Sequence, residues 1–564
     1  MNVMMHLQIA LLIAWAAFGP LPASAELRVD HSQVDLKSDA FKRFKSFVDA
    51  AVDGSPGYAF SATDAATLYA LSPKDKYCAL AVRLVQEQVD EAQARVALGQ
   101  RPPVAGDSYL EAGPMIGALA QTWQVCRAFV TDAQRSQWSS YAEQTISNIW
   151  NPGAAKWGDK PFAWTGWSID NPGNNYYYSF VEATMYWALA SNSESWMKLL
   201  REQKLPALQS YFGKLAGGGS LEGTGYGAAH MRLFALYRVW RDSTGVDLAN
   251  SNPHVSDSIR FWVHATMPTL DRFAPIGDQS RVSVPELFDY HRRLVLEARN
   301  ISNDQDARAM ASWWLNAISI GQMTSGFNFR YDLLPTGDGR TPPAALTYLA
   351  SGTGHLFART GWDRKAMWLG FNAGPYVESH AHQDQGGFTL FSGDWLAVSE
   401  NIWTHSGIQQ GTEVHNVVRF ERNGETIRQR EPSTSTMKVT RMDADTGEVH
   451  ASADLSAAYA RGAGVRSWLR DIDFADRRLT VHDTFVRDPG TVAIFQVNVP
   501  AQPVVDGRGV TAGRLRMKIV RPEDAVVSVL DWSSLDKAEF RSGWRIDVRG
   551  SGDEFLVELT DNAN

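Results

Sequence analysis

The longer, N-terminal part of the chain carries apolar residues at helical spacing. From Glu26 to about Pro335 they recur at intervals of three and four, as in the series Val82, Val85, Val89, Ala92 and Val96. Such intervals place side chains on one face of a helix. Breaks that contain Gly or Pro separate the helices, as at residues 151–153, 171–173 and 217–219. The pattern predicts a string of antiparallel helical hairpins, without the fixed-period motif of a solenoid.

The remaining part of the chain changes to strand spacing. The polar, Gly- and Pro-rich run 335–343 predicts a linker, because it can continue neither a helix nor a central strand. Beyond Gly354 apolar and polar residues alternate, as over 465–474 and 479–483, and strands are predicted to continue to 554–559. Helices first and strands afterwards predict an α+β protein of two segregated domains, which we place at 26–340 and 341–564.

The first 25 residues predict a secretory signal peptide. An apolar run from Leu7 to Phe18 is broken at 19–22 and followed by the small residues Ala23, Ser24 and Ala25, although no Lys or Arg precedes the run. No later run is long and apolar enough to predict a membrane span. We therefore expect a periplasmic or secreted protein that begins near Glu26.

Composition narrows the classes of function. A length of 564 residues with 44% hydrophobic residues can fill two cores. The net charge of −8 gives no basic footprint for nucleic acid, and nothing in the sequence indicates an oligomeric state. Cys78 and Cys126 are the only cysteines, so a Cys-rich zinc site is excluded. In an exported protein they could form a disulfide, and two buried thiols are the equal alternative.

Candidate chemistry concentrates in the segment 378–388, which contains His380 and His382. Side chains two residues apart share one face of a strand, so on a strand both imidazoles would point into one site. A third histidine, His415, follows about a strand and a loop later. Such a face suits metal binding or proton chemistry.

These motifs resemble the heparinase II/III-like polysaccharide lyases. The C-terminal part of the resemblance is H-x-H-x-D at 380–384, the turn 393–396 and His-Asn-Val at 415–417. The N-terminal part is carried by the motifs 174–176, 222–226 and 276–278, which fall in the family's order. The resemblance implies an (α/α) toroid followed by an antiparallel β-sandwich, with the active cleft between them. It also implies β-elimination at a uronic acid.

In that reaction a base removes the C5 proton while the carboxylate is neutralised. The resemblance gives the neutralising position to Asn175, with Asn174 beside it in the substrate site. Many members have His next, where this chain has Tyr176. The alternative is that both asparagines only form a turn and an N-cap.

The resemblance gives Tyr226 the role of proton donor to the leaving oxygen, with Glu222 in the same Gly-rich segment; the alternative is a packing aromatic. For a base from the second domain we expect His405, in a loop where several relatives have Tyr, and His380 is its competitor in the substrate site. A lone loop histidine can equally be ordinary surface.

One structural zinc is also expected by resemblance, bound by His382, His415 and an acidic residue. The family's Asp falls near Ser399, and Glu400 is offset by one position, which would turn it to the other face unless a bulge intervenes. The alternative is a hydrogen-bonded pair of histidines that organises the floor of the cleft.

The sequence therefore predicts an exported polysaccharide lyase whose partner is an acidic polysaccharide, such as alginate, glucuronan or a glycosaminoglycan. A glycoside hydrolase is one alternative, with Glu222 and Asp278 as its carboxylates, although neither has an evident partner. A non-catalytic polysaccharide-binding protein is the other, favoured if Tyr176 and Ser399 mark a decayed site.

Overall fold

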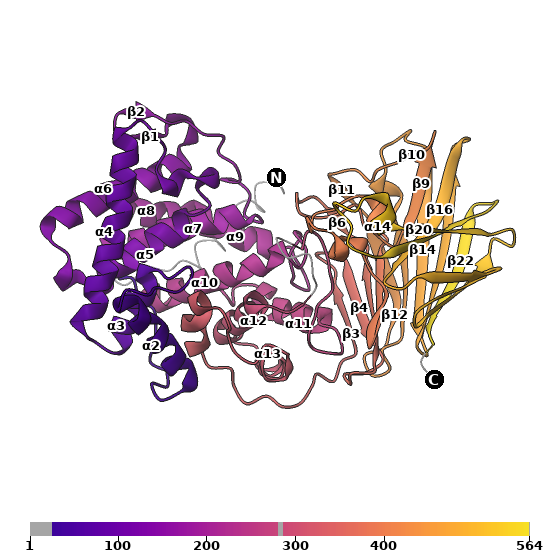
Figure 1. Ribbon diagram of the computed structural model, residues 1–564, viewed down its shortest axis with the longest axis horizontal. Coiled ribbons are helices and arrows are strands. Elements are labelled where there is room, and N and C mark those ends of the chain that lie inside the picture. Colours follow the sequence, from indigo (N-terminus) through magenta and orange to yellow (C-terminus); the bar gives the residue numbers. More distant parts are fainter. Residues whose placement is uncertain (1–24, 280–285, 563–564) are drawn as a thin grey trace, which may run out of the picture.

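The computed structural model describes residues 25–279 and 286–562. All but the last residue of the predicted signal peptide lies outside them. A helical half precedes a half made of antiparallel sheets, and the two lie side by side in Figure 1. The predicted fold class is confirmed. Within the described residues, no helix is long and apolar enough to cross a membrane.

The helices of the first half pack in neighbouring pairs, such as α5 with α7, α10 with α12 and α11 with α13. Their bounds are α2 Asp39–Val52, α3 Ala62–Leu71, α4 Asp75–Ala97, α5 Ala112–Val125, α6 Asp132–Trp150, α7 Asn175–Ser191, α8 Glu194–Leu199, α9 Leu205–Phe212, α10 His230–Thr244, α11 His254–Ala265, α12 Asp289–Ile301 and α13 Gln305–Ala317.

Local sequence sets the ends of the helices that carry the site. Asn174 is the N-cap of α7, and its side chain accepts a hydrogen bond from the backbone N–H of Tyr176. Asn192 ends the same helix in the left-handed conformation, as Gly245 does for α10. The helical series of α4 is buried at Val82, Val85, Val89 and Ala92.

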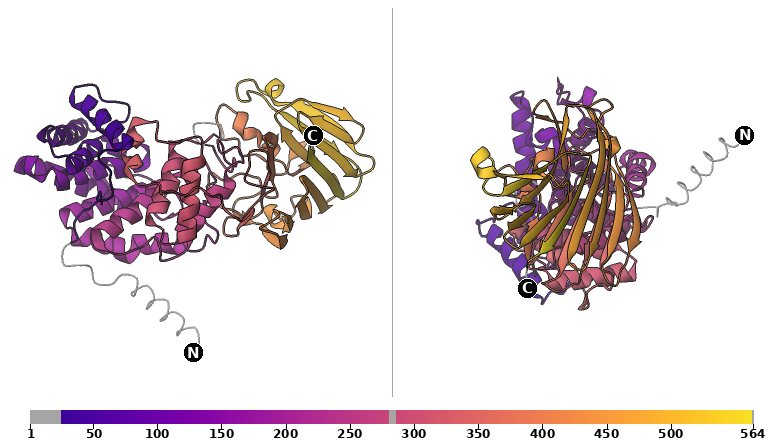
Figure 2. Two further views of the ribbon diagram at one scale, coloured as in Figure 1. Left: turned by 90° about the horizontal axis from the view of Figure 1, so that it is seen from below. Right: turned by 90° about the vertical axis from the view of Figure 1, so that its right-hand side faces the viewer.

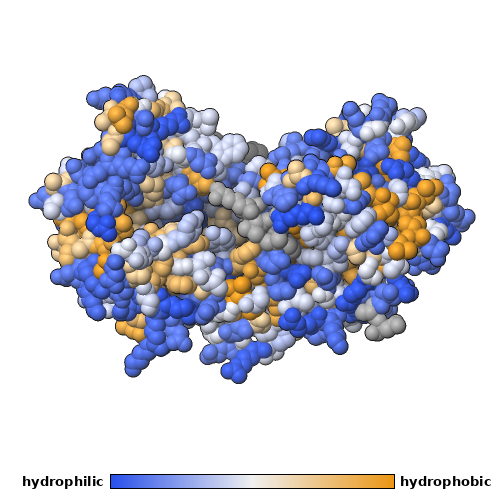
Figure 3. Space-filling view, viewed as in Figure 1, coloured by the Kyte–Doolittle hydropathy of each residue, from blue (hydrophilic) through white to orange (hydrophobic). Residues whose placement is uncertain are grey.

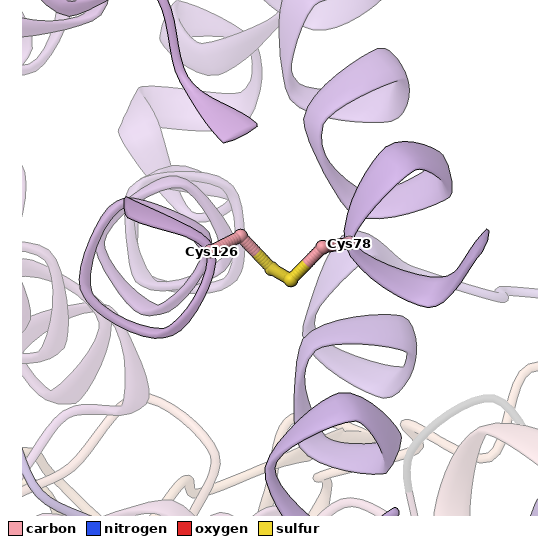
Figure 4. Close-up of a disulfide and its surroundings, with 2 residues drawn as sticks. All are labelled: Cys78 and Cys126. Carbon is pink, nitrogen blue, oxygen red and sulfur yellow. A yellow bond between two sulfur atoms is a disulfide. The ribbon is translucent and has the colours of Figure 1, made fainter. Parts of the chain in front are cut away.

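A disulfide joins two of these helices. Cys78 in α4 is bonded to Cys126, the residue that ends α5, with a Cα–Cα distance of 5.4 Å (Figure 4). Of the two alternatives for the cysteines, the structure therefore has the disulfide.

Three larger sheets make up the second half. The first has the order β3-β4-β5-β7-β8, the second β10-β9-β16-β21-β20 and the third β12-β13-β14-β15-β22-β19-β18-β17. Their bounds are β3 Thr347–Ala350, β4 His355–Arg359, β5 Met367–Asn372, β7 Phe388–Ser392, β8 Asp394–Ala397, β9 Val418–Arg422, β10 Glu425–Thr426, β12 Thr436–Met442, β13 Val449–Asp454, β14 Val465–Ala475, β15 Arg478–Arg487, β16 Thr491–Val499, β17 Pro503–Asp506, β18 Gly509–Ala512, β19 Leu515–Arg521, β20 Val526–Asp531, β21 Trp544–Arg549 and β22 Glu554–Asp561.

Short two-stranded pairs complete the sheet topology. They join β1 Lys156–Trp157 to β2 Lys160–Pro161, and β6 Pro375–Tyr376 to β11 Ser433–Thr434. The one α-helix of the described second half is α14, Trp532–Leu535, and short 3-10 helices lie at Glu400–Trp403, Thr412–Val414 and Ser456–Ala458.

The first sheet lies between the helices and the other sheets. Phe357, Trp368 and Phe391 belong to the core of the helical half, whereas their neighbours Leu356 and Leu369 belong to the core of the sheets. This alternation follows from the period of two along a strand. Figure 2 shows the sheets stacked across one end of the helical half.

Polar contacts fix this sheet to the helices. The fully buried Arg359 donates to the carbonyl oxygens of His264 and Thr266, at 2.7 and 2.9 Å. The indole N–H of Trp368 donates to the same His264 carbonyl at 2.9 Å. The two halves are therefore held by a polar network as well as by a shared core.

The outer surface of the sheet half is partly apolar. On the face shown in Figure 3, hydrophobic atoms gather over the region of β16 and β20, where Val492, Val526 and Val529 are exposed. The predicted linker 335–343 contains neither helix nor strand, and Pro335 O accepts from Arg299 of α12 at 2.8 Å.

Candidate active site

Three motifs that are far apart in the sequence meet through their backbones. The N–H of Thr224 donates to Ile276 O at 2.8 Å, and that of Asp278 donates to His380 O at 2.9 Å. A Cβ at Gly225 would overlap Asp278 O, and one at Gly277 would come within 2.7 Å of His380 O. Both positions therefore require glycine, because the backbones approach each other too closely for a side chain. The contact between Gly277 and His380 joins the two halves of the molecule.

Asp278 is the polar centre of this meeting point. It accepts hydrogen bonds from His380 Nδ1 at 2.9 Å, His382 Nε2 at 2.8 Å and Gln410 Nε2 at 3.1 and 3.2 Å. Burial alone would raise the pKa of Asp278, but hydrogen bonds from the two histidines lower it to about 2. The carboxylate is ionised and holds two side chains of the sheet half against the helical half.

His380 lies against Tyr226. The two rings are stacked, with centroids 3.5 Å apart and planes inclined by 7°. Because an ionised carboxylate can only accept, His380 Nδ1 carries the proton shared with Asp278. In the neutral ring Nε2 then has the free lone pair, as a general base requires.

The histidine pair does not lie on a strand, contrary to the sequence prediction. Residues 377–387 form turns and loop between β6 and β7, where Ala381 N–H donates to Glu378 O. The two imidazoles nevertheless reach the same partner, because each bonds to a different oxygen of Asp278.

Asn174 and Asn175 differ in their surroundings. The amide of Asn174 is buried; besides capping α7, it donates to Glu222 Oε1 at 3.3 Å. Asn175 Oδ1 is buried and has no hydrogen-bond partner among the described residues. The structure therefore assigns the capping role to Asn174, and it gives the side chain of Asn175 no hydrogen bond to any described residue.

Two buried carboxyl groups lie close behind the asparagines. Glu222 is 1% exposed, and burial, followed by the charges of Glu378 and Asp278, raises its pKa to about 8. Glu378 accepts from Asn171 Nδ2 and from the hydroxyl of Tyr211, both at 3.1 Å. Glu222 is thus mostly protonated at neutral pH, and its neighbour Glu378 is stabilised by two hydrogen-bond donors.

Tyr176 and His405 are less suited to proton transfer. The hydroxyl of Tyr176 donates to Asp107 Oδ1 at 2.9 Å, and burial together with that bond raises its pKa to about 12. His405 is exposed; its backbone N–H donates to Glu539 O, and its ring has no hydrogen-bond or ring contact with any described residue. The geometry brings His380, not His405, to Tyr226.

The expected zinc ligands are only partly brought together. His382 Nδ1 and His415 Nε2 are 3.1 Å apart, and burial holds the pKa of His415 well below its usual range. Glu400 does not join them: β8 ends at Ala397, the chain enters a 3-10 turn, and the carboxylate faces Gly543.

The donors therefore do not fit the expected zinc site. A structural zinc takes four protein donors, and a catalytic zinc takes three. In the part of the chain that the structure describes, no group of three His, Cys, Asp or Glu residues is placed to hold a metal. The hydrogen-bonded pair of His382 and His415 agrees instead with the alternative of histidines that organise the floor of the cleft.

Several residues of the site were not singled out from the sequence. Tyr211, Glu378 and Gln410 enter it only through tertiary contacts, from α9 and from two loops. Glu378 lies two residues before His380, at the start of the segment 378–388, and this position was the one available signal. Asp278 was visible in its motif, but its partners lie more than 100 residues away.

Comparison with known proteins gives matches of structure. No family model and no curated protein matches the sequence. Heparinase III matches with a TM-score of 0.60 and 13% identity, covering 97% of this chain and 88% of that one. Heparan sulfate lyase from Pedobacter heparinus matches with 0.54 and 14%, covering 94% and 84%. Chondroitin AC lyase from Streptomyces coelicolor A3, in complex with chondroitin sulphate, matches with 0.50 and 11%, covering 93% and 83%.

These matches span nearly the whole chain at low identity, so they concern the fold. The chain has the fold of heparinase III and of the related polysaccharide lyases.

Proposed function

We propose that the protein is an exported polysaccharide lyase that cleaves a uronic-acid-containing chain by β-elimination and leaves an unsaturated uronate. The observation that carries the proposal is the stack of Tyr226 on His380, whose Nδ1 is bonded to Asp278. An oriented imidazole beside a phenol supplies a proton acceptor and a proton donor at one place.

Each step of the reaction has a candidate residue. The amide of Asn175 donates to the uronate carboxylate, on which negative charge accumulates as C5 loses its proton. His380 Nε2 takes that proton, and the electron pair forms the C4–C5 double bond as the C4–O bond breaks. The hydroxyl of Tyr226 protonates the leaving oxygen. His405 has no part in these steps.

The hydrolase alternative has one feature in its favour. The pKa values of Glu222 and Asp278 are pushed apart, to about 8 and about 2, as in an acid and base pair. Both side chains are buried, however, and Asp278 already accepts from three side chains. Neither carboxyl group is presented to a glycosidic bond, so we favour the lyase.

The deciding experiment is an assay of the product's chemistry. Purified protein is incubated with alginate, glucuronan and glycosaminoglycans, and absorbance of the unsaturated uronate is followed. We expect absorbance to rise with at least one polymer. Saturated ends would indicate a hydrolase, and binding without cleavage would indicate the non-catalytic alternative.

Tyr226→Phe tests the assigned proton donor. We expect the variant to keep its fold and lose about 10²–10⁴-fold in kcat, the usual contribution of a general acid–base group. Tyr69→Phe is the matched control, since the Tyr69 ring packs on Phe129 and makes no hydrogen bond within the described chain. A Tyr226→Phe enzyme within a few-fold of wild type would remove this residue from the mechanism.

Export is the part of the proposal that rests on residues 1–25. Terminal sequencing of protein recovered from the periplasm or the medium is expected to begin near Glu26. Retention of the intact N-terminus in the cytoplasm would contradict it.

A further inference from the structure

A separate cavity of about 490 Å³ lies within the helical half. Its walls include residues of α5, α7, α10 and α12, but not Asn175, Tyr226 or His380. Glu182 lines it and follows Asn175 by seven residues along α7. Arg232 of α10 lines it as well, and Tyr226 lies in the short 3-10 helix Tyr226–Ala229 that precedes α10. Residues seven apart share a helix face about 10 Å apart along the axis, so the cavity adjoins the candidate active site.

Four arginines line this cavity, and three of them have carboxylate partners. Arg232 bonds to Glu182 at 2.8 Å, Arg238 to Glu297 at 2.8 and 3.0 Å, and Arg330 to Asp64 at 2.6 Å. These pairs neutralise the charges that the helices bury.

Arg293 is the exception. It is only 9% exposed, its Nε is buried without a hydrogen bond, and it pairs with no carboxylate among the described residues. Its guanidinium carbon lies 3.4 Å from the ring centroid of Tyr331, which also lines the cavity. The carboxylates whose charges reach Arg293, Glu297 and Glu182, already bond to Arg238 and Arg232. The cavity wall therefore buries one more cation than it has carboxylates to pair with, and a ligand can supply the missing negative charge.

Aromatic side chains gather at the same cavity. Tyr58 is 87% exposed and Tyr290 is 42% exposed, and both contact Phe327 with ring centroids 6.0 and 6.4 Å apart. All three line the cavity. Exposed rings beside a buried cation suit a ligand with apolar faces and one acidic group, as an acidic sugar has.

We propose that this cavity is a distal saccharide subsite. When one uronate of the polysaccharide occupies the candidate active site, Arg293 binds the anionic group of another sugar further along the same polysaccharide. The anionic group can be a carboxylate or a sulfate, because the planar guanidinium can bind either one through two parallel hydrogen bonds. This inference rests on the proposed function for the identity of the chain, but its binding step is independent of cleavage.

The test is a binding measurement in a variant that does not consume its ligand. Calorimetric titrations use Tyr226→Phe and Tyr226→Phe/Arg293→Met. The ligands are saturated hexasaccharides of heparosan and of chondroitin sulfate, with maltohexaose as the neutral control. We expect Arg293→Met to weaken binding of an acidic hexasaccharide about tenfold or more, the usual loss for a hydrogen bond to a charged group. The heparosan and chondroitin sulfate arms distinguish a carboxylate-only site from one that also takes sulfate.

A matched variant and a stability measurement separate binding from folding. Arg299→Met changes an arginine of the same helix that bonds to Ser312 and Pro335 O outside the cavity, and affinity should be unchanged. Because Arg293→Met removes a buried cation that has no anionic partner, its Tm should be equal to or above that of its parent. A merely structural arginine would instead lower the Tm and leave affinity unchanged.

The outcomes distinguish this inference from the proposed function. If the wild type cleaves a polymer but Arg293→Met binds it equally well, the subsite is wrong and the lyase stands. If the wild type forms no unsaturated product but Arg293→Met still loses affinity, the lyase is wrong and the subsite stands. No saturable binding of any acidic hexasaccharide would overturn the subsite.

Discussion

The two adjacent asparagines at the start of α7 have different hydrogen-bonding roles. Asn174 caps the helix and bonds to Glu222, whereas the buried Oδ1 of Asn175 has no hydrogen-bond partner within the described chain. A polar atom left unpaired in a protein interior costs free energy, and a functional contact is one explanation of such a residue. This difference explains why one asparagine serves the fold while its neighbour can serve the substrate.

Asn175→Ala should therefore act on catalysis. We expect kcat to fall by about 10²-fold, as when one oxyanion donor is lost, with a smaller change in KM because the interaction strengthens in the transition state. Asn192→Gly, at the left-handed C-cap of the same helix, is the matched control and should leave kcat unchanged. Steady-state kinetics on the cleaved polymer check both, and a normal kcat in Asn175→Ala would refute the role.

Glu222 gives a prediction about pH. Its pKa rises from 4.5 to about 8 in the folded protein, so the folded state binds the proton more tightly than the unfolded state. Its stabilising contribution is complete below about pH 4.5 and is lost as pH rises through about 8. Glu222→Gln should therefore flatten the fall of unfolding free energy across this window.

Denaturant unfolding at about pH 5 and about pH 9 measures this effect. Glu87→Gln, on the exposed side of α4, is the control and should keep the wild-type dependence. The assignment fails if Glu222→Gln shows the same dependence as wild type.

Sequence reasoning reached some of these residues and missed others for identifiable reasons. The alternation over 465–474 predicted β14, because one face of that strand is buried. His380 and His382 bond to one carboxylate, but they do so from a loop and not from the shared strand face that the sequence predicted. Their common partner Asp278 could not be predicted, because it approaches only when the two halves pack together.

At the scale of elements, glycines determine how closely the segments of the site approach one another. Gly225 has an ordinary backbone conformation, with φ −71° and ψ −64°, so its requirement comes from the neighbouring backbone at Asp278. No helix or strand holds this junction. The pattern of apolar residues therefore predicted the helices and strands but not the contact between the loops that joins them.

Gly225→Ala should separate these segments. We expect a lower Tm and at least about a tenfold loss of kcat, because displacements near 1 Å in an active site have effects of that order or more. Gly153→Ala is the control, since its added methyl group meets no atom within 4 Å and its backbone conformation is ordinary. Thermal denaturation and kinetics check both, and equal behaviour of the two variants would contradict the role of close approach.

At the scale of the whole molecule, the core of the helical half extends into the first sheet of the sheet half. Phe357, Trp368 and Phe391 of the first sheet are buried among helical residues, and Arg359 bonds to carbonyl groups of the helical half. Domains joined only by a linker and a small polar interface would be able to unfold separately.

We therefore expect a single unfolding transition in calorimetry, with equal calorimetric and van't Hoff enthalpies. Arg359→Met removes the bonds to His264 and Thr266, so we expect it to split the single transition into two, one for each half. Arg477→Met, whose bonds to Ser392, Lys365 and Asp561 stay within the sheet half, is its control. Two well-separated transitions in the wild type would show that the shared core does not couple the halves.

The position of β22 affects how the chain can be made. This strand follows every other described strand in the sequence, yet it lies inside the third sheet, paired with β15 on one side and β19 on the other. During synthesis one edge of β15 therefore stays unpaired until residues 554–561 have left the ribosome. Its open edge in that interval is a place for mispairing with other chains.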